Sequence, residues 1–119
     1  MTTLQAMFNQ ALSSLQAGQL DSATAQIDKL LASDPQNADA LHLAALIEKS
    51  KLNYGASETY FRRSLACSEK QPVVLSNLAN LMKTMGRFTE ANDLYLTAIE
   101  VMPNFYDAWV NRGFMAKEM

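Results

Sequence analysis

The feature that most constrains this 119-residue chain is an internal repeat with a period of 34 residues. The segment GRFTEANDLY (86–95) aligns with GQLDSATAQI (18–27), and the segment LNYGASETYF (52–61), halfway between them, fills the same columns. The alignment needs no insertion anywhere along the chain. A period of this length indicates stacked supersecondary units, because one such unit cannot bury its apolar face alone.

Each repeat has the pattern of two helices joined by a short turn. The chain is rich in Ala, Leu, Gln and Met and holds only 4 Gly and 3 Pro, which favours helix over strand. Gly18 and Gly86 follow the first helix of their repeats, where a residue with a left-handed backbone would end it. Pro35 and Pro103 mark the end of the second helix. These signals predict an all-α fold with helices at about 2–17, 20–33, 38–50, 54–68, 72–85, 88–101 and 105–118.

Small residues recur in two columns of the repeat. The small column of the first helices comprises Ala11, Ala45, Ala79 and Gly113. The small column of the second helices comprises Ala23, Ser57 and Ala91. Small side chains at these positions would let the two helices of one repeat approach closely, so the columns predict helical hairpins.

These columns resemble the tetratricopeptide repeat, whose period is also 34 residues. The motif residues at the family spacing are Ala91, Tyr95, Ala98 and Pro103 in the third copy and Trp109 and Gly113 in the fourth. The resemblance covers the whole chain as one domain over 1–119, with repeats at about 4–37, 38–71 and 72–105 and an additional helix at 105–119. It implies antiparallel hairpins that stack into a right-handed superhelix. The second copy departs most, because Leu52 stands where its neighbours have Gly.

The composition and motifs do not indicate an enzyme. A net charge of −2 gives no electrostatic case for nucleic acid or an anionic membrane. His42 is the single histidine, which excludes histidine-cluster metal sites, and Cys67, the single cysteine, has no base adjacent in sequence. The sequence has no Gly-rich phosphate loop and no paired-carboxylate pattern. We therefore expect a non-catalytic protein with no metal and no cofactor.

The termini and the hydropathy pattern bear on localisation. The start of the chain, MTTLQAMFNQ, lacks the basic and apolar regions of a signal peptide. No apolar run approaches the roughly 18 residues of a membrane span. We expect a soluble, cytoplasmic protein.

The resemblance implies that the first helix of each hairpin lines a concave groove, which is where such solenoids bind their partners. The expected peptide-binding groove comprises Phe8, Asn9, Leu12, His42, Leu43, Leu46, Lys49, Asn77, Asn80, Lys83, Asn111, Phe114 and Lys117, and the same helix faces also carry Gln5 and Asp39. Chaperone-binding members of the family hold a ligand carboxylate with a clamp of Lys, Asn and Arg. The neighbouring groove positions are instead apolar, at Phe8, Leu12, Leu43 and Val73, so we do not expect that clamp.

Two columns of the expected groove are polar. Asn9, Asn77 and Asn111 share one column, which Leu43 interrupts. A side-chain amide both donates and accepts, so it can pair with the backbone of an extended peptide. The third copy resembles the repeats of O-linked N-acetylglucosamine transferases, where such an asparagine ladder holds peptide backbones.

Lysines form the second polar column, and its members are Lys49, Lys83 and Lys117. A basic edge of this kind would favour an acidic ligand segment. Lysine at the end of a helix also complements the helix dipole without any ligand. Both interpretations remain open at this point.

The predicted function is a non-catalytic scaffold that binds an extended segment of a protein or peptide partner. One alternative is the N-terminal, substrate-recruiting region of a larger enzyme of the glycosyl- or sulfotransferase type. Another is a self-association module that forms a homodimer through its C-terminal helix, because Trp109, Val110 and Phe114 are too apolar for full exposure. The same apolar helix favours the interpretation that the chain is a fragment of a longer protein.

Overall fold

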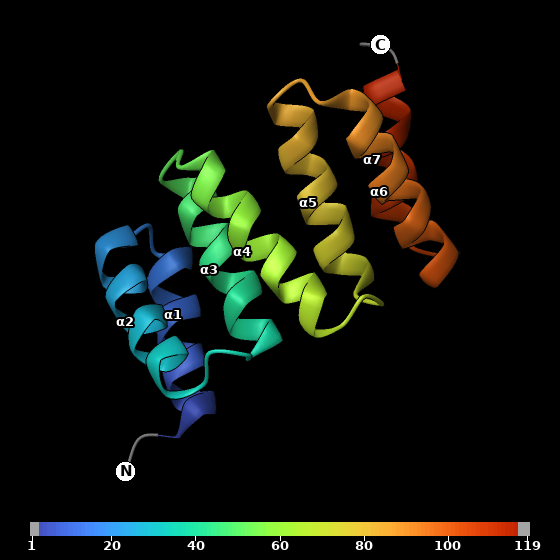
Figure 1. Ribbon diagram of the computed structural model, residues 1–119. Coiled ribbons are helices and arrows are strands. Elements are labelled where there is room, and N and C mark those ends of the chain that lie inside the picture. Colours follow the sequence, from blue (N-terminus) through green and yellow to red (C-terminus); the bar gives the residue numbers. More distant parts are fainter. Residues whose placement is uncertain (1–2, 117–119) are drawn as a thin grey trace. The chain divides into compact units, whose positions relative to one another are not determined.

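The computed structural model describes residues 3–116, and the described part of the chain is entirely helical apart from short connections (Figure 1). The helices are α1 (Leu4–Gln16), α2 (Leu20–Ser33), α3 (Ala38–Ser50), α4 (Tyr54–Cys67), α5 (Pro72–Thr84), α6 (Phe88–Val101) and α7 (Tyr106–Ala116). They lie close to the seven predicted ranges. The predicted all-α, helical-repeat fold class is confirmed.

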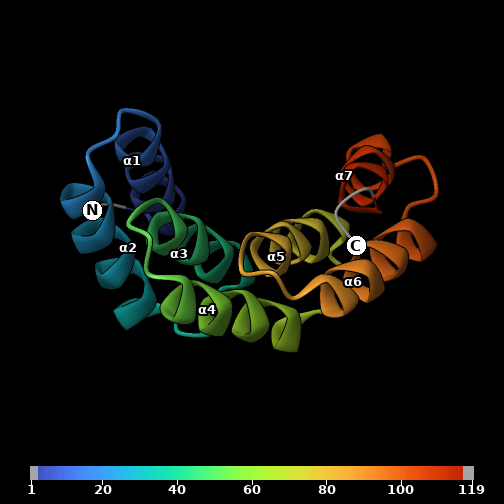
Figure 2. The same ribbon diagram turned by 90° about the horizontal axis from the view of Figure 1, so that it is seen from above.

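The chain divides into two compact units, each of which is built from helical hairpins. Unit 1 spans Met1–Cys67, and in it α1 pairs with α2, α3 pairs with α4, and α2 packs on α3. Figure 2 shows α1 and α3 in one layer of this unit and α2 and α4 in the other. Unit 2 spans Ser68–Met119, where α5 pairs with α6 and α7 packs against both.

The turn between the two helices of each hairpin has the same backbone geometry in all three repeats. The residues at its centre have positive φ angles: Gly18 (76°), Leu52 (66°) and Gly86 (77°). In each turn the next backbone N–H donates to a carbonyl five residues earlier, closing a Schellman motif. These bonds are Gln19 to Ser14 (2.9 Å), Asn53 to Glu48 (2.9 Å) and Arg87 to Met82 (2.8 Å). The predicted helix ends at the two glycines are confirmed, and Leu52 adopts the same turn despite its side chain.

The small columns lie where the helices of a hairpin meet. Ala11, Ala45 and Ala79 are fully buried, as are the small residues opposite them on α2, α4 and α6. Gly113, the fourth member of the first column, is instead exposed, and a Cβ built on it would have no atom within 4 Å. Among the described residues, packing therefore requires a small side chain at the first three positions but not at Gly113.

Candidate peptide-binding face

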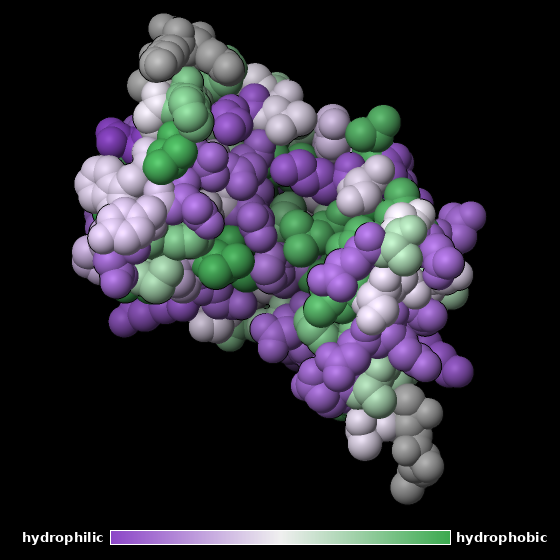
Figure 3. Space-filling model, turned by 180° about the vertical axis from the view of Figure 1, so that it is seen from behind, coloured by the Kyte–Doolittle hydropathy of each residue, from purple (hydrophilic) through white to green (hydrophobic). Residues whose placement is uncertain are grey.

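The first-helix face of unit 1 is the side of this unit that carries α1 and α3. Phe8 and Leu12 on α1 are half-buried and pack against the core cluster beneath them. Leu46 on α3 is also half-buried, whereas Asn9 is exposed. Figure 3 views the molecule from this side, and hydrophobic side chains, in green, gather over α1 and α3. The predicted groove residues of unit 1 thus supply an apolar surface that remains partly open to solvent.

Leu43 is the exception, and its predicted place in the groove is wrong. It is 2% exposed and belongs to the core cluster, which brings together residues of α1, α2 and α3. A side chain enclosed in this way cannot contact a ligand without local unfolding. The break in the asparagine column therefore has a structural reason, because an apolar side chain is required at this position.

A notch opens at the N-terminal end of this face. Its volume is about 130 Å³, and it is lined by Leu4, Gln5, Phe8, Asn37 and Asp39. Asn37 is the N-cap of α3: its Oδ1 accepts from the Ala40 N–H at 3.0 Å. Our sequence-based groove missed Leu4 and Asn37. An N-cap signal, Asn just before a helical run, could have located the second of these.

His42 lies between the face and the interior of unit 1. Its ring is half-buried, with its centroid 5.9 Å from that of Phe61 and a tilt of 45°. Burial lowers the pKa of His42 below its usual 6.5, and the nearby Asp39 carboxylate opposes that shift. The imidazole is therefore uncharged at neutral pH and packs as an aromatic ring.

The first-helix face of unit 2 carries two members of the asparagine column. Asn77 on α5 and Asn111 on α7 are both half-buried, and their helices pack against each other. Phe114 on α7 is exposed, and Lys83 on α5 is half-buried. The predicted groove residues of unit 2 thus combine side-chain amides, one ammonium group and one exposed ring.

Asn80 also lies on α5, but its amide takes part in closing the hairpin. The Tyr95 hydroxyl, from α6, donates to Asn80 Oδ1. Tyr95 is fully buried, and burial raises its pKa to about 12, so it is a neutral donor at any physiological pH. The amide oxygen of Asn80 is therefore used inside the protein, and the place of Asn80 in the groove remains a prediction.

Two of the three lysines of the predicted basic edge lie within the described residues. Lys49 and Lys83 are each the basic residue in the last turn of their helix, where a positive charge favours the helix dipole. Both are half-buried. Lys117 lies outside the described residues. The basic edge therefore remains a prediction.

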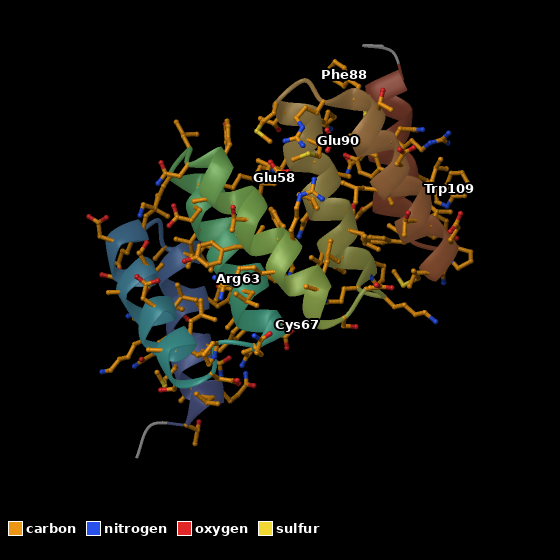
Figure 4. All side chains as sticks on the ribbon, in the orientation of Figure 1. Glu58, Arg63, Cys67, Phe88, Glu90 and Trp109 are labelled. Carbon is orange, nitrogen blue, oxygen red and sulfur yellow. The ribbon has the colours of Figure 1, made fainter. Side chains whose placement is uncertain are left out.

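The structure gives further information on the residues that were considered for chemistry. Cys67 is exposed on α4, one turn after Arg63 (Figure 4), and its Sγ lies 3.3 Å from the Arg63 carbonyl oxygen. Among residues 3–116, no group of three or more His, Cys, Asp or Glu side chains could hold a metal ion. No helix of the described part of the chain is both long and apolar enough to cross a membrane.

Comparison with solved structures identifies the architecture. The first TPR of Spaghetti (RPAP3), bound to the HSP90 peptide SRMEEVD, matches with a TM-score of 0.90 at 16% identity, over 97% of this chain and 91% of that one. The chain has a tetratricopeptide-repeat fold. The same fold relates it to Pseudomonas aeruginosa PilF, with a TM-score of 0.91 at 24% identity over 98% of this chain and 53% of that chain.

A third solved structure with this tetratricopeptide-repeat arrangement belongs to an enzyme. A Thermobaculum terrenum O-GlcNAc transferase mutant matches with a TM-score of 0.88 at 24% identity, over 97% of this chain. The chain spans only 23% of that transferase and about half of PilF. No protein-family model and no curated protein matches the sequence. At these identities the likeness establishes the fold and leaves function to be argued from the residues.

Proposed function

We propose that this chain is a non-catalytic peptide-binding module whose first-helix faces hold an extended segment of a partner protein. The observation that carries the proposal is the repetition of Asn77 and Asn111, one period apart on the packed helices α5 and α7. A side-chain amide can both donate to and accept from a peptide backbone, so two of them at this interval suit a ligand without a fixed sequence. The first-helix face of unit 1 offers apolar contacts of its own through Phe8, Leu12 and Leu46.

The neighbouring structures agree with this proposal in kind. The first TPR of RPAP3 is bound to an HSP90 peptide. The peptide in that complex is acidic at its C-terminus, whereas unit 1 offers apolar side chains and Asp39. We therefore infer a partner segment of different chemistry, bound at micromolar strength or about −8 kcal/mol.

The test is capture of peptides from a random library by the full 119-residue chain. The double variant Asn77→Ala with Asn111→Ala should bind at least about tenfold more weakly, since each lost amide contact is worth about 1 kcal/mol. Asn104→Ala, in the exposed turn before α7, is the matched control and should bind like the parent. Unchanged capture by the double variant, with helicity intact, would sink the amide-ladder proposal.

A second candidate is the substrate-recruiting region of a larger transferase, which the likeness to part of an O-GlcNAc transferase favours. The binding face would be the same, and the ligand would then be the substrate of the attached enzyme. The complete open reading frame distinguishes the two, because only the second requires a catalytic domain in the same chain.

A third candidate is self-association through α7. Trp109, Val110 and Phe114 on this helix are 46%, 52% and 60% exposed. Because Trp109 is the single tryptophan, its emission reports on this surface alone. A sedimentation coefficient and an emission maximum that do not change with protein concentration would contradict the dimer.

A further inference from the structure

The two side-chain amides that line the notch of unit 1, those of Gln5 and Asn37, both make hydrogen bonds within the protein. The Asn37 amide is used within the protein, since its Oδ1 caps α3 and its Nδ2 donates to Asp34 Oδ2 at 3.2 Å. Gln5 donates its Nε2 to Asn9 Oδ1 at 3.0 Å. Each of the two lining amides thus already donates one N–H to an acceptor of the protein itself.

The one charged group among the five lining residues is the Asp39 carboxylate, which is exposed. Leu4 and Phe8 supply the apolar part of the same wall. His42, on the next turn of α3, is kept uncharged by burial, so it does not neutralise Asp39 at neutral pH. The notch therefore combines an apolar wall with a negative charge.

We propose that this notch receives a lysine or arginine side chain of the partner segment, a specificity that rests on the proposed peptide-binding function. The aliphatic stem of such a side chain would lie on Leu4 and Phe8 while its charged end pairs with Asp39. The Phe8 ring offers the cation a further favourable contact. The volume of about 130 Å³ is several times the roughly 30 Å³ that one water molecule occupies in the liquid, so the notch can take a side-chain end.

Asp39 also has a structural role that the test must separate from recognition. It lies in the first turn of α3, where a negative charge stabilises the helix dipole. Asp21 has the same place in α2 and does not line the notch. Asp21→Asn therefore removes an equivalent helix-terminal charge and serves as the matched control for Asp39→Asn.

The experiment uses the full chain and pools of random dodecapeptides in which one central position is fixed as Lys, Arg, Gln or Glu. The parent should capture the Lys and Arg pools about fivefold better than the Gln pool, the upper range for a solvent-exposed ion pair. Asp39→Asn should lose this preference and keep its capture of the Gln pool, and Asp21→Asn should keep the preference. Asp39→Lys should favour the Glu pool instead.

Two outcomes overturn the proposal in different ways. Equal capture of all four pools by the parent, or a preference that survives in Asp39→Asn, rejects the basic side chain but leaves peptide binding standing. No capture of any pool rejects both proposals.

A measurement on the parent alone covers the case in which Asp39→Asn fails to fold. In an NMR titration, Nα-acetyl-lysine methylamide should shift the backbone amide signals of Phe8 and Asp39. Its uncharged norleucine analogue should shift them much less. Equal shifts with both probes, or none with either, would show that the notch does not recognise the charge.

Discussion

The hairpins α3–α4 and α5–α6 follow the same repeat but are closed by different polar contacts. In the first, the hydroxyls of Ser57 and Ser64 donate to the carbonyls of Ala45 at 2.7 Å and Ala38 at 2.8 Å. In the second, alanines replace both serines, and the polar contact runs from the Tyr95 hydroxyl to an amide on α5. Every buried side-chain nitrogen or oxygen among the described residues has a partner in either arrangement.

The difference teaches that the contact between two side chains changes as a matched pair, whereas the serines, whose acceptors are backbone carbonyls, can change alone. Tyr95 and Asn80 in the α5–α6 hairpin correspond to Phe61 and Leu46 in the α3–α4 hairpin, so one hairpin has both polar partners and the other has neither. A buried hydroxyl without an acceptor costs free energy, whereas an apolar pair of similar shape does not. The small residues at the helix crossing, by contrast, stay small in both hairpins.

The largest expected effect tests what the two hairpins share. Ala79→Trp should lower the free energy of unfolding by about 3 kcal/mol or more, because Ala79 is fully buried where α5 meets α6 and an indole would force them apart. Ala45→Trp should do the same in the other hairpin. Denaturant unfolding followed by circular dichroism measures both.

Gly113→Ala is the control in the same column. Gly113 faces open space within α7, so alanine should raise stability slightly, by at most about 1 kcal/mol, through its better helix propensity. A melting temperature for Ala79→Trp equal to that of the parent would mean that the hairpin register is wrong.

The next largest effect on stability concerns the hydrogen bond between Tyr95 and Asn80, which only the α5–α6 hairpin has. Asn80→Leu alone should cost about 2 kcal/mol, because it leaves the buried Tyr95 hydroxyl without its acceptor. Adding Tyr95→Phe recreates the Leu46–Phe61 pair of the other hairpin and should recover most of that loss. A double-mutant cycle of urea unfolding measures the coupling, and strictly additive effects would argue against matched exchange.

These differences also explain which parts of the molecule the sequence could predict. Helix ends followed from local signals, and those within the described residues lie within one residue or so of the prediction. Leu43 was misplaced because its core cluster includes residues of α1 and α2, which its own column does not reveal. The hydrogen bond of Asn80 within the hairpin was not predicted, because its partner, Tyr95, lies on the next helix. The predicted groove lacked two residues of the notch. The notch forms only where the N-terminus of α3 lies beside α1, which brings Leu4 and Asn37 together.

Substitutions in the turns should have a smaller effect on the free energy of unfolding, and its sign should be opposite in the two hairpins. A non-glycine residue in the left-handed region costs about 1 kcal/mol or slightly more, so Gly86→Leu should destabilise the protein by that amount. Leu52→Gly should relieve the same strain, and its net gain should be smaller because glycine also gains entropy in the unfolded chain. Thermal unfolding of both variants checks the sign. Destabilisation by Leu52→Gly would indicate that the leucine side chain, 71% exposed, makes a contact worth more than the strain.

The smallest effect is a pH dependence confined to the α3–α4 hairpin. Burial lowers the pKa of His42 in the folded protein below the 6.5 of the unfolded chain, so the unfolded state binds more protons as the pH falls. The stability that depends on a neutral His42 is therefore complete above about pH 6.5 and declines below it. The α5–α6 hairpin has Ser76 in this column and no titratable group there.

His42→Phe isolates this contribution, since Phe8 occupies the same column in α1 and a ring can still lie against Phe61. Urea unfolding at about pH 7.5 and about pH 5 should show a larger loss of stability in the parent than in the variant, because only the parent must bury a group that prefers to be protonated. Carboxylates titrate in both proteins and cancel in the difference. Equal losses would mean that His42 is as well solvated in the folded chain as in the unfolded one and that it contributes nothing to the pH dependence of stability.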